Sequence, residues 1–302
     1  MYIDIHCHLT GGEYDSVENV LARAKENGVG RIVCSAFDLD SAYIAAELAE
    51  LYEEVYFCVG FHPSELAKYQ DGDLEKLRVL CKCEKCIAVG EIGLDYHFED
   101  NPPKETQREF FYRQLVLADE VGLPVVIHSR DAAQETLEFL QAHKELLKKG
   151  GLLHCYSYSA EMLTEFEKLG LYFSFGGPCT FKNAAKVQEC VRRVPATRLL
   201  SETDCPYLTP VPFRGVFPNE PKNVKYVVET FAALRNEKTE ALEKQIFENA
   251  KKSGFVRARV DGEVVDLYEE LKLEVEITYG RHQKQSTIGA KPQRGRRQKT
   301  PS

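Results

Sequence analysis

The chain has 302 residues, of which 43% are hydrophobic and 28% are charged. This composition is typical of a globular protein with a large core, and the length suits one α/β barrel of about 250 residues or two smaller domains. Apolar runs fall well short of the roughly 20 residues that a membrane span needs, and the first residues lack the basic region of a signal peptide. We therefore expect a cytoplasmic protein that makes no membrane contact.

Charge is distributed unevenly along the chain. The seven basic residues of Arg281–Ser302 leave 32 basic and 47 acidic residues in Met1–Gly280, a net charge of −15. Such an acidic body is not a general binder of nucleic acid, because broad affinity for phosphate backbones comes from many Lys and Arg contacts. Any contact with nucleic acid must then be local and helped by bound cations. The tail is rich in Gly, Pro, Ser, Gln and Arg, which predicts disorder.

The ten cysteines are expected to stay reduced in a cytosolic chain of this size. Half of them lie in apolar surroundings and are interpreted as small core residues: Cys34, Cys58, Cys155, Cys179 and Cys190. One cluster, Cys81-x-Cys83-x-x-Cys86, has ligand-like spacing. The cluster lacks a second pair of ligands, so the sequence does not decide whether these three cysteines bind a structural metal ion.

Short apolar runs alternate with longer amphipathic runs from the first residue onward. The predicted elements, in chain order, are a strand at 2–8, a helix at 16–26, a strand at 31–35, a helix from 40 or 41 to 51, a strand at 55–60, a helix at 74–81, a strand at 86–90, a helix at 104–121, a strand at 124–127, a helix at 132–148, a strand at 152–153, a helix at 160–169, a strand at 171–174, a helix at 184–193, a strand at 198–201, and helices at 224–234 and 239–252.

This alternation predicts a parallel sheet, because strands buried on both faces read as continuous apolar runs. Eight strand–helix units fit a closed (β/α)8 TIM barrel over residues 1–254, followed by an extension at 255–280 and a basic tail at 281–302. An open doubly wound sheet is the competing fold. It would place a Gly-rich phosphate loop after the first strand, where this chain has His6-Cys7-His8.

Polar residues mark the ends of the predicted strands. His6 and His8 lie on one face of the first strand, because side chains alternate along an extended chain. Such a pair alone is equally consistent with two packed imidazoles. The other strands end in a matching set of polar residues: His62, Glu91, His128, His154 and Asp204. All strand ends of a barrel face one mouth, where active sites are built, so five histidines and two carboxylates there predict a metal centre.

Several motifs resemble those of the TatD family of metal-dependent deoxyribonucleases. They cover about residues 1–254 in order: His6-x-His8-Leu9, Gly60-Phe61-His62-Pro63, Gly90-Glu91-Ile92-Gly93-Leu94-Asp95-Tyr96, His128-Ser129-Arg130, His154-Cys155-Tyr156, Ser201-Glu202-Thr203-Asp204-Cys205-Pro206-Tyr207-Leu208 and Phe213-Arg214-Gly215. The resemblance implies a barrel of the amidohydrolase superfamily with a two-metal phosphodiesterase site. The family's last helix usually ends in Asn-Ala-x-x-Leu-Phe, and here Asn249–Phe255 is a loosened version.

The resemblance also implies roles for individual residues. His6, His8 and Asp204 would hold the first metal, Glu91 would bridge, and His128 and His154 would complete the second. Mixed imidazole and carboxylate ligands suit Zn²⁺, Mn²⁺ or Co²⁺, whereas more carboxylate or water would favour Mg²⁺. Asp204 is the candidate general base, although water on a metal needs no separate base.

Phosphate contacts and supporting partners complete the implied site. Arg214 and His62 are interpreted as phosphate contacts, because the guanidinium of Arg offers a planar fork. Arg130 would act similarly or fix the loop at His128. Asp95 and Glu202 would orient histidines.

The expected activity is hydrolysis of DNA or another phosphodiester, of the exonuclease type. The alternatives are an amidohydrolase-superfamily enzyme acting on an amide, lactone or aminoacyl ester, and a non-catalytic binding protein. In the former a carbamylated lysine often bridges the metals, and here the bridging place holds Glu91. The sequence does not indicate the oligomeric state.

Overall fold

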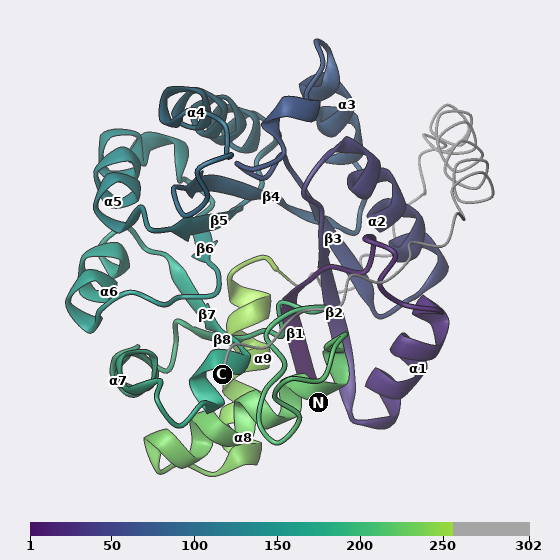
Figure 1. Ribbon diagram of the computed structural model, residues 1–302, viewed down its shortest axis with the longest axis vertical. Helices are drawn as coiled ribbons and strands as arrows, with labels where there is room; N and C mark the ends of the chain where they lie inside the picture. Colours follow the sequence, from purple (N-terminus) through teal and green to yellow (C-terminus); the bar gives the residue numbers. More distant parts are fainter. Residues whose placement is uncertain (256–302) are drawn as a thin grey trace, which may run out of the picture. The chain divides into compact units, whose positions relative to one another are not determined.

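The computed structural model describes residues 1–255, in which eight strands and nine α-helices alternate (Figure 1). The predicted tail, and the predicted extension apart from Phe255, lie outside the described residues. The elements are β1 (Tyr2–Cys7), α1 (Val17–Glu26), β2 (Val29–Ser35), α2 (Leu39–Leu51), β3 (Val55–Val59), α3 (Asp73–Leu80), β4 (Cys86–Asp95), α4 (Lys104–Val121), β5 (Val125–Arg130), α5 (Ala133–Ala142), β6 (Gly151–Leu153), α6 (Ala160–Glu167), β7 (Tyr172–Phe175), α7 (Ala185–Arg193), β8 (Leu199–Ser201), α8 (Val224–Arg235) and α9 (Thr239–Lys252).

All eight strands form one sheet in the order β1 to β8, and each pairs in parallel with the next. The strands surround a central axis and the helices lie outside them (Figure 1). The predicted (β/α)8 barrel is therefore confirmed. Among the described helices, none is both long enough and apolar enough to cross a membrane.

Burial explains why the apolar runs became strands. Every residue of β3 and of β4 is buried, as expected for parallel strands that are covered on both faces. The helices bury one face only. In α1 that face consists of Val20, Leu21 and Ala24, and the Ser16 side chain accepts a hydrogen bond from the first turn at its N-cap.

Several predicted boundaries were wrong. Strand β5, predicted at 124–127, runs through Arg130, so His128 lies within it. Helix α2 is capped by Asp38, because Asp38 and Ser41 bond reciprocally to each other's backbone in a capping box. The helix predicted at 132–148 ends at Ala142, and Lys144–Leu146 form a separate 3₁₀ turn; no Gly or Pro marks this break. Strand β4 continues through Asp95, so Glu91 lies within it.

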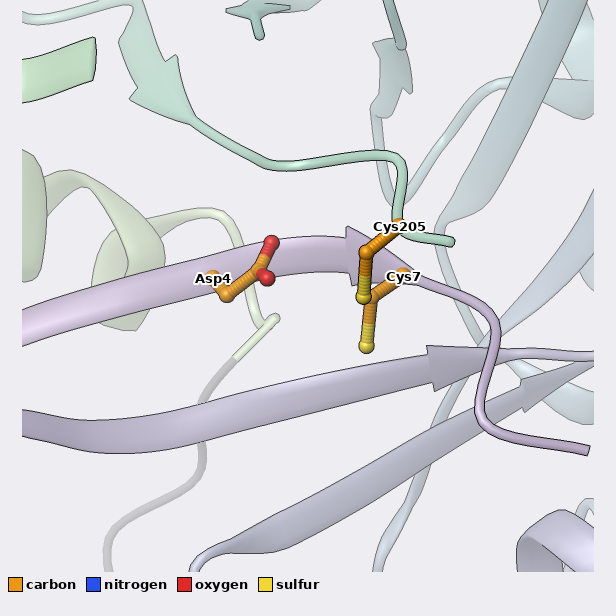
Figure 2. Close-up of side chains that lie close together, drawn as sticks. All are labelled: Asp4, Cys7 and Cys205. Atoms are coloured by element: carbon orange, nitrogen blue, oxygen red, sulfur yellow. The ribbon is translucent and has the colours of Figure 1, made fainter. Parts of the chain in front are cut away.

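The barrel closes where its first and last strands meet. The Asp204 N–H donates to the His6 carbonyl at 3.0 Å, and the His8 N–H donates to the Cys205 carbonyl at 2.7 Å. Asp4, Cys7 and Cys205 lie together at this seam (Figure 2). Both Asp4 oxygens accept hydrogen bonds from Thr203, one from its N–H and one from its hydroxyl. Asp4 therefore ties β1 to the segment that follows β8.

Candidate metal centre

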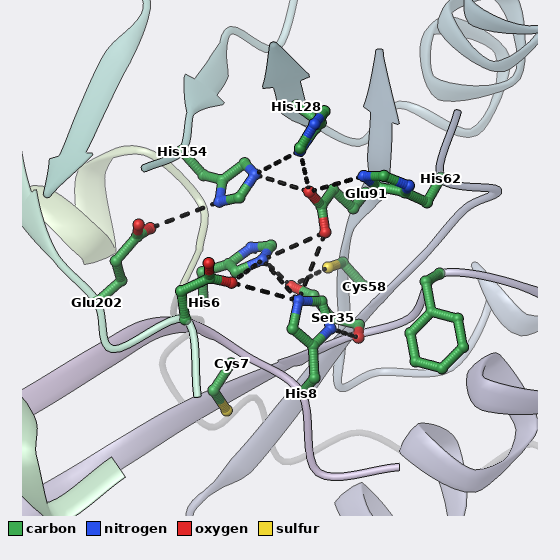
Figure 3. A network of polar contacts seen from close by, with 12 residues as sticks. His6, Cys7, His8, Ser35, Cys58, His62, Glu91, His128, His154 and Glu202 are labelled. Carbon is green, nitrogen blue, oxygen red and sulfur yellow. Dashed lines mark hydrogen bonds and ion pairs between the residues drawn. The ribbon is translucent and has the colours of Figure 1, made fainter. Parts of the chain in front are cut away.

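The structure brings all six predicted ligands together at the carboxyl-terminal mouth of the barrel. Figure 3 labels all of them except Asp204. They come from different strands or from the residues just after them: His6, His8, Glu91, His128, His154 and Asp204. Parallel strands make this possible, because residues far apart in sequence reach one edge of the sheet.

A first group of ligands forms around the His-x-His pair of β1. The Nε2 atoms of His6 and His8 lie 3.3 Å apart. They lie 3.4 and 3.6 Å, respectively, from Oε2 of Glu91, and 3.6 and 3.4 Å from Oδ1 of Asp204. Ligands about 2.1 Å from a tetrahedral ion are separated by roughly 3.4 Å. These four side chains therefore have the spacing that one divalent ion requires.

A second group forms around the other oxygen of Glu91. His128 Nδ1 and His154 Nε2 each lie 2.7 Å from Oε1 of Glu91, and they lie 3.3 Å from each other. His62 Nε2 lies 3.6 Å from the same oxygen. Glu91 thus presents one oxygen to each group. Imidazole nitrogens and a shared carboxylate are suitable ligands for two divalent ions, so the donor types present fit such a pair. The two 2.7 Å contacts are of hydrogen-bond length, shorter than the roughly 3.4 Å between two ligands of one ion.

The carboxylates of the centre are held in the ionised form. Burial raises the pKa of Glu91, but His154, His62 and His6 outweigh this effect and hold its pKa well below the ordinary value. The pKa of Asp204 is also lowered, because hydrogen bonding and charge from the neighbouring histidines exceed the cost of burial. Ionised carboxylates are the form that binds a cation.

The histidines divide into two kinds. Burial, with His154 nearby, lowers the pKa of His6 to about 4, so this imidazole is neutral and has a free lone pair. Burial also disfavours the charged form of His8 and His128, but the carboxylates beside them raise both pKa values to about 9. Protons on these two histidines offset the carboxylate charge, and a bound cation would take over that role.

Hydrogen bonds at the far side of the rings orient the first two histidines. The Ser35 hydroxyl lies 2.9 Å from His6 Nδ1, and the Ser35 carbonyl oxygen lies 2.9 Å from His8 Nδ1. When Nε2 of each ring holds an ion, the one proton that remains on the ring is assigned to Nδ1. Ser35 thus fixes both rings of the pair. The sequence analysis missed it, although Ser35 ends a strand like the predicted ligands.

The remaining histidines have carboxylates or a hydroxyl nearby. Asp95 Oδ2 lies 3.2 Å from His128 Nε2, in the orienting position expected for Asp95. The Ser64 hydroxyl lies 2.7 Å from His62 Nδ1. Glu202 Oε2 is 3.9 Å from His154 Nδ1, which is beyond hydrogen-bond length, and it accepts a bond from another hydroxyl. Burial raises the pKa of Glu202 to about 7.

The two predicted arginine contacts are exposed side chains. Arg130 ends β5, and its guanidinium carbon lies 5.0 Å from the centroid of the Phe98 ring. Arg214 lies in the loop between β8 and α8, 4.1 Å from the centroid of the Phe181 ring. Their roles toward phosphate remain predictions.

All ten cysteines are free. Among residues 1–255, the clusters with metal-binding geometry do not include Cys81, Cys83 and Cys86. Cys86 is buried at the start of β4, whereas Cys81 and Cys83 are half-buried.

An eight-stranded parallel barrel with two imidazole groups around one shared carboxylate is an arrangement suited to a metal-dependent hydrolase. The model of the family described as TatD related DNase matches residues 3–253. The chain is 44% identical to the uncharacterized metal-dependent hydrolase YabD of Bacillus subtilis, over 83% of this chain and 98% of that protein. It is 31% identical to the 3'-5' ssDNA/RNA exonuclease TatD of Klebsiella pneumoniae, over 82% of this chain and 95% of that one.

A solved structure supports the same relationship. The TatD homolog YjjV from Escherichia coli superposes with a TM-score of 0.80 at 32% identity, covering 85% of this chain and 98% of that one. The chain therefore belongs to the TatD family. The family predicted from the sequence motifs is confirmed, and so is the class of metal-dependent hydrolase.

Proposed function

We propose that the chain is a two-ion, divalent-metal-dependent deoxyribonuclease of the exonuclease type. The arrangement of Glu91 carries this proposal, because its two oxygens face different histidine groups at 2.7 to 3.6 Å. His6, His8 and Asp204 would hold the first ion with Glu91, and His128 and His154 the second. Zn²⁺, Mn²⁺ and Co²⁺ suit these ligands best, and Mg²⁺ is an alternative.

When bound, two such ions would supply Lewis acidity to a phosphoryl oxygen and to water. Asp204, ionised by its histidine neighbours, is proposed to accept the proton released during attack on phosphorus. Arg214, Arg130 and His62 are proposed to bind the substrate's phosphates. Asp95 would keep His128 in place through its hydrogen bond. Glu202, 3.9 Å from His154 Nδ1, would act on His154 through its charge rather than through a hydrogen bond.

Hydrolysis of an amide, lactone or aminoacyl ester is the alternative within the same fold. Glu91 in the bridging position argues for phosphodiesters, because the carbamylated lysine expected of the alternative would have to occupy this position. The cytoplasm is the proposed compartment, since ten free thiols fit a reducing environment.

The test is incubation of metal-loaded protein with single- and double-stranded DNA labelled at either end. We expect Mg²⁺, Mn²⁺ or Zn²⁺ to support stepwise shortening from one end, and Asp204→Ala to abolish it. Asp119→Ala is the matched control, because Asp119 pairs with Lys148 in the outer helical layer. Absence of cleavage with all three metals, or equal cleavage by Asp204→Ala, would refute the nuclease assignment.

A further inference from the structure

The loop between β8 and α8 concentrates exposed apolar side chains. Ten large apolar side chains are exposed in the described part of the chain, and six of them lie within residues 207–217. These six are Tyr207, Leu208, Val211, Phe213, Val216 and Phe217, with exposed fractions between 37% and 60%. Scattered exposed apolar residues need no explanation, but a concentration of them in one loop indicates a binding surface.

This 207–217 loop is firmly anchored. The Thr209 hydroxyl donates to the Val216 carbonyl at 2.6 Å, which closes the loop on itself. The buried Asn219 donates through its amide to the Tyr207 carbonyl at 2.7 Å. The Tyr14 hydroxyl in turn donates to the Asn219 carbonyl at 2.6 Å. The apolar side chains are therefore presented by a fixed backbone.

The loop begins at the edge of the metal centre. Tyr207 follows the ligand Asp204 by three residues, and its N–H donates to the Asp204 carbonyl at 3.1 Å. The Tyr207 and Phe217 ring centroids are 6.1 Å apart. Two partly exposed rings thus lie near each other, and one of them belongs to a residue bonded through its backbone to the ligand Asp204.

The same loop carries a cation. Arg214 is exposed, and among residues 1–255 no ion pair with an acidic side chain is formed by its guanidinium. It stacks on Phe181 instead, with 4.1 Å between its central carbon and the ring centroid. In a chain whose first 280 residues carry a net charge of −15, this guanidinium is a local attraction for phosphate.

We propose that the 207–217 loop is a stacking platform for the unpaired bases of a single-stranded polynucleotide whose end lies at the metal centre. The inference rests on the proposed function and names the form of its substrate. Tyr207 and Phe217 provide π-faces that accept any base, and Arg214 of the same loop provides the phosphate contact. Paired bases in a duplex have their faces covered by neighbours, so the platform selects strands that are already open.

The experiment compares a Tyr207→Ala/Phe217→Ala variant with the wild type on two substrates. One is an oligothymidylate, and the other is bis(p-nitrophenyl) phosphate, which has no nucleobase. Loss of base stacking weakens binding by roughly 5- to 150-fold. We compare the ratio of the variant's KM to the wild-type KM on each substrate. The ratio for the oligothymidylate should exceed the ratio for the small diester by a factor in this range. Tyr112→Ala, which truncates a 43% exposed ring on α4, is the matched control.

A binding measurement that needs no turnover accompanies the kinetics. Fluorescence anisotropy in the presence of a chelator should show tighter binding of oligothymidylate than of an abasic strand of equal length, and the double variant should abolish this preference. Equal binding of the two strands by the wild type would overturn the proposal. The oligomeric state of both proteins is measured as well. If the wild type is a dimer, the double variant is a monomer and KM is unaltered, the loop contacts a second copy of the chain and the proposal is overturned.

The outcomes separate this inference from the proposed function. If the wild type cleaves neither substrate with any metal, the nuclease assignment fails, whereas anisotropy still decides whether bases bind the loop. If both substrates are cleaved and the double variant matches the wild type on each, only the platform is refuted.

Discussion

Replacing Ser35 with alanine tests whether one residue organises the first ligand group. The substitution removes the hydroxyl that lies 2.9 Å from His6 Nδ1. It leaves the backbone carbonyl that lies 2.9 Å from His8 Nδ1. Only one of the two histidines therefore loses its orienting partner, and the backbone path of β2 is retained.

The expected magnitude follows from burial. Ser35 and His6 are both 0% exposed, so water cannot replace the lost bond. Leaving a buried polar group without a partner costs about 1–3 kcal/mol in the free energy of unfolding. Removing a hydrogen-bond partner behind a metal-binding histidine typically lowers metal affinity by about 10- to 100-fold. Ser35→Ala should show both effects.

The assay is competition between the protein and a chromogenic chelator for Zn²⁺, with thermal unfolding of the metal-free protein measured in parallel. Ser201→Ala is the matched control, because Ser201 is equally buried and its hydroxyl donates to the Ile3 carbonyl at 2.9 Å. The Ser201→Ala variant should lose thermal stability but bind zinc as tightly as the wild type. If both variants bind zinc as the wild type does, Ser35 does not position His6 and the reasoning is wrong.

Three further predictions concern the same region. Asp95→Asn should weaken one of two metal-binding steps by about 10- to 100-fold and leave the other unchanged, because among the ligands Asp95 supports only His128. Calorimetry measures both steps, and equal weakening of the two would contradict this. Metal affinity should rise with pH through neutrality and level off above pH about 9, because His8 and His128 must release protons before they bind an ion. Calorimetry in buffers of different ionisation enthalpy measures the number of protons released on metal binding. Gly93→Ala should lower the free energy of unfolding by at least about 2 kcal/mol in urea titrations, because a Cβ at φ +147° would overlap the His128 carbonyl. The control is Gly72→Ala. A Cβ there meets open space, so the substitution should lower the free energy of unfolding by only about 1 kcal/mol.

The ligands could be predicted from the sequence because each belongs to a strand that the apolar pattern already marked. Once the barrel is assumed, the ends of its strands must meet, so His128 and His154 become neighbours of Glu91 without any knowledge of distances. The predicted meeting of these residues agrees with the 2.7 Å contacts of the second group. Their roles as ligands remain to be tested by metal binding.

The supporting contacts could not be predicted in the same way. Whether Ser35 reaches His6 depends on the register of β1 against β2, which the sequence pattern does not specify. The start of α2 was misplaced because Asp38, Asp40 and Ser41 are all plausible caps, and only the reciprocal bonds select Asp38. The exposed rings of the 207–217 loop were missed because apolar letters alone do not reveal exposure.

The barrel seam has a consequence for how the protein is made. The first ligand group joins His6 and His8, from the first strand, to Asp204, which follows the eighth. During synthesis from the N-terminus, the histidine pair leaves the ribosome long before its carboxylate partner exists. A nascent chain lacking β8 can form neither the seam nor the complete ligand group. High affinity for the first ion would thus arise only when the barrel is finished, which keeps partly made chains from retaining an ion in that incomplete group.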